Sequence, residues 1–503
     1  MICKRCTQTS NGQAEGNGGT TTQHDAAANL QKFSVVTKNT FDQSSYAAVM
    51  SLCDHAYDAD HPNPYHLEGD VKTHTDMVHQ QMTNLLKELA PSERYGEAMV
   101  LEAIGHDFGK TIMRTPVPEK MRVRFNNHPQ WSQILFYQYL VENGLADKYI
   151  ENGMLYPMLL SINLHDDAFD IYATESPLTE KMRQKWGGMF AYNPPLLPLL
   201  ASINYADDHG RITEQDTSNA NNYYGDFIDS FGNPGFPERK AEPILAGTKK
   251  DARQVAEAIR EKPTILMMVG LPGSGKSYLS NEVLNGLSED EYMVVSFDDA
   301  VNKYAAENGM TYDEVHADKN LLDICHTRMN EEVERRLASE KKPKIIVLDK
   351  THVSAKARNQ DLVNLEGILN RARKNGTEFP DYRTVCVNAI TPMSLTTDRV
   401  RNRPGKYIAQ EVVVGMATRY SLPYFGERIN SNRNKPWSYD NILIAWTNLN
   451  NEVTFQEYCP DSPQEVTANV DMNKLKGIFK KELEWEKKPE KLDGIFKILG
   501  CAS

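Results

Sequence analysis

The chain has 503 residues, more than one hydrophobic core usually supports, so we expect at least two domains. A hydrophobic content of 40% and a charged content of 25% are typical of globular proteins and exclude a fibrous or largely disordered chain. The net charge of -12 and the isoelectric point near 5.6 exclude a surface coated in positive charge, so any nucleic-acid contact must come from local lysine and arginine clusters.

The cysteines indicate the redox compartment. They number 7 and are scattered, which favours a reducing compartment over a disulfide framework, and we expect a cytoplasmic protein. Cys3 and Cys6 form a CxxC pair, but a tetrahedral zinc site needs four ligands and no second pair follows, so we interpret them as free thiols. Neither a leader nor a long apolar run is recognisable, so the sequence predicts no secretion and no membrane insertion.

The first half of the chain reads as a tail followed by helices. Residues 1–32 are rich in small and polar side chains with little surface to bury, which predicts a flexible tail. Residues 33–230 carry apolar side chains at helical spacing, for example Met77, Met82, Leu85 and Leu89, and predict an all-α domain. Prolines and glycines gather within residues 231–262, where we expect a linker.

Histidines and aspartates recur through this helical half. The candidate metal ligands are His74, His106, Asp107, His128, His165 and Asp207. Imidazole suits transition metals and carboxylate suits harder ions, so such a set can hold one or two divalent ions. A lone histidine on a helix is more often a core or surface residue, but the order of these residues, with an adjacent His-Asp pair, favours metal binding.

The stretches HLEGDVKTHTDMV, AIGHDFGK, NNHPQWS, NLHDD and NYADDHGR resemble the HD phosphohydrolase superfamily between about Tyr65 and Arg211. The resemblance implies an ion that is a divalent transition metal (Mn2+, Fe2+, Ni2+, Co2+ or Zn2+). Its implied core ligands are His74, His106, Asp107 and Asp207, with His128 and His165 extending the set to a second ion or binding phosphate. It also implies that Lys110 contacts the scissile phosphate. Asp208 could exchange roles with Asp207, whereas His66, His79 and His209 are interpreted as ordinary residues.

The second half changes its pattern. Within residues 263–430, short apolar runs at 265–269, 293–296, 345–348 and 384–389 alternate with helical segments, which predicts an α/β domain with a parallel sheet. Residues 431–503 are interpreted as a C-terminal extension of this domain. There, the run 442–446 predicts an edge strand, and residues 473–486 predict a surface helix rich in lysine and glutamate.

Residues 270–277 read GLPGSGKS, a G-x-x-x-x-G-K-[ST] loop between an apolar run and a helical one. Gly270, Gly273 and Gly275 let backbone amides turn toward phosphate oxygens, at the positive end of a helix. Lys276 is expected to reach the β- and γ-phosphates and Ser277 to bind Mg2+, and Ser274 and Tyr278 complete a predicted site for ATP or another NTP.

Carboxylates follow the next two apolar runs. Asp298 and Asp299 come after residues 293–296, where open α/β sheets bind ligands, so one of them could deprotonate an acceptor hydroxyl. The alternative is a helix cap, which would need only one of them. Asp349 follows residues 345–348 and predicts a Walker-B-like carboxylate or an acceptor-binding loop.

Arginines gather near a Pro-Gly bend at residues 404–405. Arg399, Arg401 and Arg403 predict a lid that closes on the triphosphate, and a solvated basic helix end is an equally good interpretation.

From about Lys262 to Gly426 these motifs resemble the polynucleotide kinase family of P-loop phosphotransferases. The resemblance implies that Asp298 is the general base and Arg403 the lid arginine, with Arg401 as its rival. That family typically has an arginine three residues after the base to hold the acceptor phosphate, and here the position is Val301. The residues that could replace it are Arg328, Lys303 and Lys350.

Together the two resemblances point to end-healing enzymes in which an HD domain precedes a polynucleotide kinase. They imply an ATP-dependent 5′-hydroxyl kinase joined to a metal-dependent 2′/3′-phosphate phosphohydrolase, which acts on RNA or DNA ends, with RNA as the expected substrate, upstream of a nucleic-acid ligase. One alternative is an HD nucleotidase fused to a small-molecule or nucleoside kinase, which the acidic composition and Val301 favour. Another is a regulatory module in which the P-loop only binds nucleotide.

Overall fold

The computed structural model describes residues 43–172, 180–214, 228–229, 241–403, 408–427 and 439–480. The tail predicted at residues 1–32, the Cys3–Cys6 pair and the Pro404–Gly405 bend lie outside the described residues.

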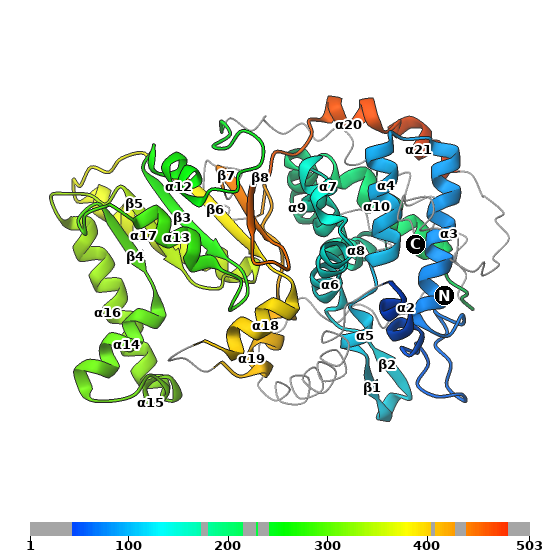
Figure 1. Cartoon of the computed structure of the whole chain (residues 1–503), viewed down its shortest axis with the longest axis horizontal. Coiled ribbons are helices and arrows are strands. Elements are labelled where there is room, and N and C mark those ends of the chain that lie inside the picture. Colours follow the sequence, from blue (N-terminus) through cyan, green and yellow to red (C-terminus); the bar gives the residue numbers. More distant parts are fainter. Residues whose placement is uncertain are drawn as a thin grey trace.

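The N-terminal half is helical (Figure 1). Its helices are α2 (Gln43–Ser51), α3 (Val71–Leu89), α4 (Glu93–Gly105), α5 (Lys110–Met113), α6 (His128–Glu142), α7 (Ala146–Glu151), α8 (Leu155–Tyr172), α9 (Glu180–Tyr192) and α10 (Leu196–His209). Helix α3 begins where the Asp70 carboxylate accepts a hydrogen bond from the Thr73 amide. Helix α6 is buried on almost every side and therefore forms the centre of the half.

The prediction of an entirely helical half was wrong at one place. Strands β1 (Thr115–Val117) and β2 (Arg122–Arg124) form an antiparallel hairpin. Pro116 and Pro118 explain it, because proline lacks the amide that a helix interior requires. Within the described part of the chain, no helix is long and apolar enough to cross a membrane.

The C-terminal half contains a six-stranded sheet in the order β4-β5-β3-β6-β7-β8. The strands are β3 (Thr264–Val269), β4 (Tyr292–Val295), β5 (Ile345–Asp349), β6 (Arg383–Ile390), β7 (Asn441–Thr447) and β8 (Val453–Glu457). All neighbouring pairs are parallel except β7 and β8. The prediction that residues 442–446 form an edge strand was wrong, because β8 covers β7 and is itself the edge.

Helices cover both faces of this sheet. They are α12 (Ala252–Arg260), α13 (Lys276–Leu284), α14 (Phe297–Asn308), α15 (Tyr312–Ala317), α16 (Lys319–Ala338), α17 (Ala355–Lys374), α18 (Met393–Arg401) and α19 (Gln410–Ala417). Alternate residues of β3 enter two different cores, with Met267 in the one that holds α16, α17 and the helical half, and Met268 in the one that holds α12 and α13. Residues 252–260, expected in a linker, are therefore part of the sheet's covering layer.

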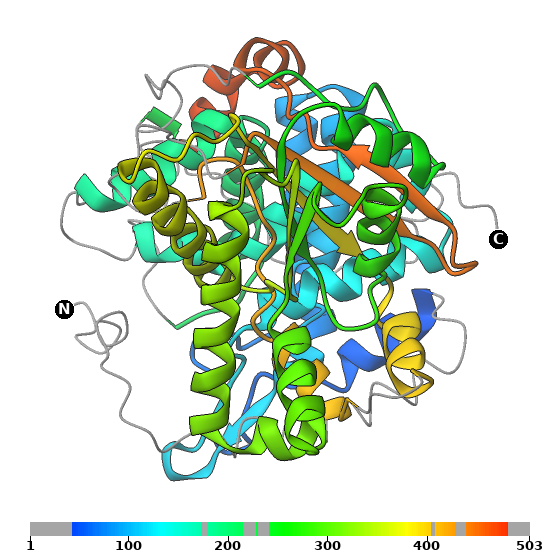
Figure 2. The ribbon, with the colours of Figure 1, turned by 90° about the vertical axis from the view of Figure 1, so that its left-hand side faces the viewer.

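The connections after β3 and β5 lie on opposite faces of the sheet. Such a switch opens a crevice at the carboxyl ends of the two strands, where α/β proteins bind ligands. Helices α14, α15 and α16 stand at the end of the sheet away from the helical half, as Figures 1 and 2 show. The fold thus places the P-loop, which follows β3, beside the loop that follows β5.

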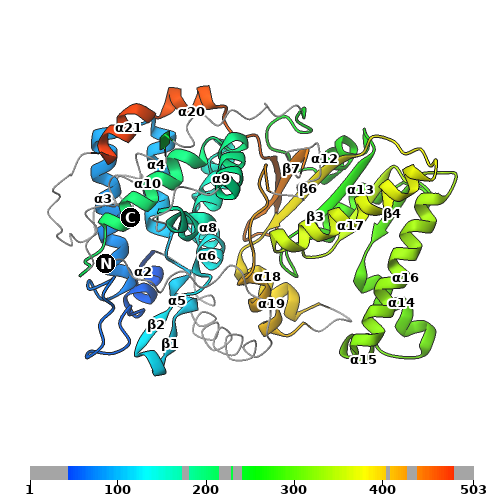
Figure 3. The ribbon, with the colours of Figure 1, turned by 180° about the vertical axis from the view of Figure 1, so that it is seen from behind.

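The C-terminal helices return to the helical half. Helices α20 (Pro463–Asn469) and α21 (Met472–Phe479) lie over α3 and α4, as seen from behind in Figure 3. Leu475, Ile478 and Phe479 are buried, so the surface helix predicted at residues 473–486 is amphipathic and docked up to Phe479. Its remaining residues lie outside the described part of the chain.

Residues 418–427 join the two halves by hydrogen bonds to side chains of the helical half. Trp131 Nε1 donates to Thr418 Oγ1 at 3.1 Å, and Gln133 Nε2 donates to the Tyr420 carbonyl at 3.1 Å. The Pro423 carbonyl accepts from Tyr156 and the Phe425 carbonyl from Asn193, both at 2.7 Å. One hydrophobic core also runs through both halves. The halves are therefore packed together rather than only tethered.

Arg358 holds the loop after β5 to this segment. Its guanidinium is fully buried, pairs with Glu427 and donates to the carbonyls of His352 and Ser421, each at 2.9 Å. Removing one partner of a buried, hydrogen-bonded ion pair leaves the other charge uncompensated, which is strongly destabilising.

We expect Arg358→Leu to lower the free energy of unfolding by about 3 kcal/mol or more, as measured by urea denaturation. Arg371→Leu is the control, because Arg371 forms an exposed pair with Glu334 and its loss should cost less than about 1 kcal/mol. Equal effects of the two substitutions would contradict this view of the buried pair.

Candidate active sites

The six predicted metal ligands converge from five segments of the helical half. His74 lies in α3, His106 caps α4 and is followed by Asp107, His128 opens α6, His165 lies in α8 and Asp207 in α10. All six are buried. The turn after Asp107 can approach α6 because of Gly109, where a Cβ atom would lie 2.1 Å from the His128 carbonyl oxygen. Ser132 Oγ accepts the Gly109 amide at 2.9 Å and fixes this turn.

The ligand atoms form two sets that share Asp107. In the first set, Nε2 of His74 lies 3.0 Å from Asp207 Oδ1, and Nε2 of both His74 and His106 lies 3.4 Å from Asp107 Oδ2. In the second set, Asp107 Oδ1 lies 3.1 Å from His128 Nε2 and 3.9 Å from His165 Nε2. The Asp107 carboxylate therefore bridges the two sets.

The histidine rings are oriented by backbone carbonyls. The Nδ1 atoms of His106, His128 and His165 lie 3.1, 3.0 and 2.7 Å from carbonyl oxygens three residues earlier. A carbonyl only accepts, so each Nδ1 carries a proton, and in a neutral ring the Nε2 atom then presents a lone pair. Nε2 of His128 and Nε2 of His165 face each other at 3.1 Å, so a cation or a shared proton must separate them.

Charges in this cluster suit metal ligands. Burial raises the pKa of the Asp107 carboxyl, but Lys110 and His106 outweigh it and hold that pKa well below its usual range. Burial is likewise outweighed at Asp207, where His74 lowers the pKa. Burial lowers the pKa of His165 to about 4, which keeps its imidazole neutral.

The first set of residues also has buried nitrogen and oxygen atoms that lack a hydrogen bond and could bind a metal. Among the described residues, Nε2 of His74, Nε2 of His106 and both oxygens of Asp107 are buried without a hydrogen bond of acceptable geometry. Buried polar atoms rarely remain unpaired, and imidazole with carboxylate suits a divalent transition metal. Asp208 instead pairs with Arg211, so the geometry favours Asp207 over Asp208 as the ligand.

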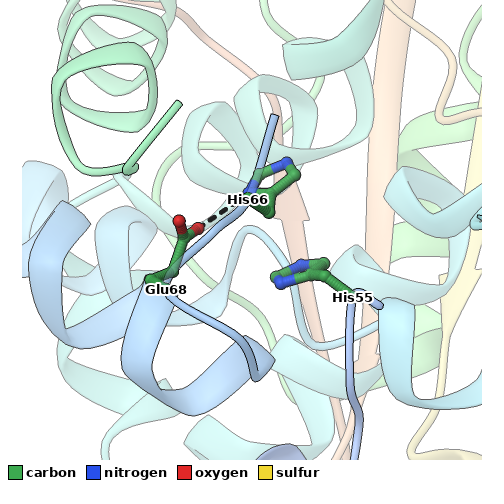
Figure 4. A group of neighbouring side chains, drawn as sticks. All are labelled: His55, His66 and Glu68. Atoms are coloured by element: carbon green, nitrogen blue, oxygen red, sulfur yellow. Dashed lines mark hydrogen bonds and ion pairs between the residues drawn. The ribbon is translucent and has the colours of Figure 1, made fainter. Parts of the chain in front are cut away.

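Three residues lie beside this centre: His55, His66 and Glu68 (Figure 4). The sequence did not identify His55 or Glu68 as site residues, and it led us to interpret His66 as an ordinary residue. Glu68 Oε1 lies 2.8 Å from His66 Nδ1 and 3.0 Å from His74 Nδ1. The Glu68 carboxylate is thus within ion-pair distance of the His74 ring, on the side from which carboxylates often support metal-binding histidines. The HLEGD spacing could have suggested Glu68 and His66, whereas no sequence signal places His55 here.

These three residues do not form a good metal site themselves. The rings of His55 and His66 stack with centroids 4.2 Å apart and planes 16° apart. A metal binds in the plane of an imidazole, and nearly parallel planes do not meet at one ion. Lys110 Nζ also lies 3.5 Å from His55 Nε2 and 2.6 Å from Asp107 Oδ2, so a cation already occupies this side.

The predicted P-loop leaves β3 and enters α13 at Lys276. Gly273 has a φ of 81°, and a Cβ atom there would lie 2.8 Å from the Thr396 carbonyl oxygen, so only glycine fits. Gly270 and Gly275 also have positive φ values. Ser274 is buried, whereas Ser277 and Tyr278 are exposed in the first turn of α13.

The charges around Lys276 come from three other segments. Burial lowers the pKa of Lys276 to about 8, with Asp349 and Asp298 opposing this effect and Arg403 adding to it. Arg403 therefore lies near the P-loop lysine, whereas Arg401 pairs with Asp398 at 3.4 Å on the surface. Arg399 Nη1 donates to the Gly273 carbonyl at 3.0 Å and so supports the P-loop, a role that the sequence did not distinguish.

Asp298 lies in the first turn of α14 and is exposed. The helix cap is Ser296, whose hydroxyl accepts from the Asp299 amide, so the capping alternative does not explain the aspartate pair. Tyr312 donates to Asp298 Oδ1 at 2.8 Å. Strand β5 lies between β4 and β3, so Asp349 is on the strand next to the P-loop strand, and Asp298 follows a strand one place farther away. Burial raises the pKa of the Asp349 carboxyl.

Val301 is fully buried in the small core of α14, α15 and α16 and cannot face a ligand. Arg328 pairs with Glu307 at 2.7 Å, and Lys350 pairs with Asp361 at 2.8 Å. Lys303 is exposed on α14. Of these three, Lys350 directly follows Asp349 at the carboxyl edge of the sheet.

A family model described as an AAA domain matches residues 265–423, less than half of the chain. The match includes the P-loop and the strands after it and supports a P-loop kinase-like domain in the C-terminal half. No curated protein matches the chain.

We expect Glu68→Ala to weaken binding of a divalent transition metal by about 10- to 100-fold, because the His74 ring loses its supporting carboxylate. Calorimetric titration of metal-stripped protein with Mn2+ measures this. Glu93→Ala, at an exposed position of α4, is the matched control and should bind as the unsubstituted protein does. Unchanged affinity in Glu68→Ala would remove Glu68 from the site.

Proposed function

We propose that the protein heals nucleic-acid ends, most simply those of RNA, with two activities. The C-terminal half is a 5′-hydroxyl kinase that uses ATP and Mg2+, and the N-terminal half is a metal-dependent phosphohydrolase that removes 2′- or 3′-phosphates. The observation that carries the proposal is the presence, in one chain, of a P-loop lysine on which the charges of Asp349, Arg403 and Asp298 act and a buried set of candidate ligands bridged by Asp107.

In the kinase reaction, Lys276 and the P-loop amides hold the β- and γ-phosphates, and Ser277 holds Mg2+, which offsets phosphate charge. Asp298 accepts the proton of the 5′-hydroxyl while the hydroxyl oxygen bonds to the γ-phosphorus. The bond between that phosphorus and the β,γ-bridging oxygen breaks, and ADP leaves. The charge of Arg403 acts on Lys276, and in this proposal its guanidinium stabilises charge on the transferring group.

In the hydrolase half, one ion would be held by His74, His106, Asp107 and Asp207, and a second by Asp107, His128 and His165. Divalent ions in such sites supply Lewis-acid stabilisation of phosphoryl oxygens and a water that loses its proton readily. Lys110, which pairs with Asp107, would bind an oxygen of the substrate phosphate. His55 Nε2 lies 3.5 Å from the Lys110 ammonium and can accept a hydrogen bond from it.

The two activities are chemically complementary. A ligase requires a 5′-phosphate and a 3′-hydroxyl on the two ends that it joins. The kinase supplies the first and the phosphohydrolase the second. A downstream ligase is the expected partner reaction.

Asp298→Asn should reduce transfer of labelled γ-phosphate from ATP to a 5′-hydroxyl oligonucleotide by at least about 100-fold, because the general base is lost. Nucleotide binding should persist, since the substitution leaves Lys276 and the P-loop amides in place. Asp313→Asn, an exposed carboxylate on α15, is the control. Absence of transfer by the unsubstituted protein, or preferential use of mononucleosides, would contradict the polynucleotide kinase proposal.

Asp107→Asn should abolish phosphate release from an oligonucleotide with a 3′-phosphate, because the bridging charge between both ion sites is lost. Chelation should have the same effect on the unsubstituted protein, and added Mn2+ should restore it. Release of phosphate is measured with malachite green. Full hydrolysis by Asp107→Asn would rule out this cluster as the hydrolytic centre.

A further inference from the structure

A stacked pair of rings lies next to Asp298. Phe297 immediately precedes Asp298 and opens α14, and its ring stacks on His326 of α16 with centroids 3.9 Å apart and planes 15° apart. His326 is exposed. Phe297 therefore covers one face of an imidazole that remains accessible to solvent.

The pair lies at the carboxyl edge of the sheet. Phe297 follows β4 by way of Ser296, and Lys350 follows β5. Burial lowers the pKa of His326, and the next contribution is the nearby charge of Lys350. A cavity lined by Lys350 and by Met329 of α16 supports this placement, because Met329 and His326 are three residues apart on one helix face.

The pair has a rigid base. Phe297 packs against the apolar cluster of Val301, Ala305, Val315 and Cys325, and Cys325 is the residue before His326. Val301 thus contributes to the core beneath the rings rather than to a phosphate contact. The acceptor must therefore gain binding energy from other groups. An aromatic surface beside the proposed general base can supply it, because nucleobases stack on aromatic side chains.

We propose that the exposed face of His326 is the stacking platform for the nucleobase of the acceptor's 5′-terminal nucleotide. This inference rests on the proposed kinase function. Stacking accepts every base, so it gives affinity for a nucleic-acid end without sequence preference. It also selects an acceptor that carries a nucleobase over a simple alcohol or sugar.

The test compares two 5′-hydroxyl oligonucleotides, one with an ordinary 5′-terminal nucleotide and one with an abasic residue there. The unsubstituted protein should show a KM about tenfold higher for the abasic acceptor. His326→Ala should raise the KM for the ordinary acceptor by a similar factor and remove the difference between the two. His326→Phe, which preserves stacking, should keep the difference, and the KM for ATP should stay unchanged throughout.

Two controls make the result specific. Arg335→Ala alters an exposed residue of the same helix, paired with Glu332, and should behave as the unsubstituted protein. The fluorescence of a 2-aminopurine at the 5′ end should be quenched when the oligonucleotide binds, and binding to His326→Ala should quench it less. Equal use of both acceptors by the unsubstituted protein, or discrimination retained in His326→Ala, would overturn the platform. No transfer to either acceptor would overturn the kinase proposal itself, which is a different result.

Discussion

Both halves of the molecule depend on the burial of helix α6. Its first residue, His128, belongs to the second ligand set, and Ser132, one turn later, holds the turn after Asp107. Farther along, Tyr137 donates to the Thr447 carbonyl at the end of β7, and Thr447 Oγ1 lies 3.0 Å from Thr391 Oγ1. Thr391 in turn donates to the Ser274 carbonyl in the P-loop. One apolar helix therefore fixes backbone at both candidate centres.

The two centres solve opposite electrostatic problems. In the helical half, the Asp107 and Asp207 carboxylates are buried among histidines, where an unpaired charge is costly and a cation is strongly favoured. At the sheet edge, Asp298 and Arg403 are exposed, and the protein relies on loop geometry and on the helix terminus at Lys276. The first centre is enclosed by protein, whereas the second is open to solvent.

Local patterns predicted much of this arrangement. The P-loop, the strand ends carrying Asp298 and Asp349, and the His and Asp series are recognisable because their spacing follows from strand and helix geometry. The docking of α21 on α3 depends on long-range packing that no local period encodes, whereas the hairpins β1–β2 and β7–β8 join segments that are close in the sequence. His55 lies in a loop and its ring contacts the Gly69 carbonyl, so no sequence pattern predicts that His55 lies beside Lys110.

The hydrogen bonds to residues 418–427 bear on how this chain can be divided. Side chains of the helical half satisfy backbone carbonyls in the P-loop half, and the C-terminal helix returns to cover α3. Cutting between the halves would expose those carbonyls together with the apolar surfaces around them. Neither half is an interchangeable module. A recombinant protein that received one half would also need the surface of the other half that satisfies these carbonyls and covers the apolar residues.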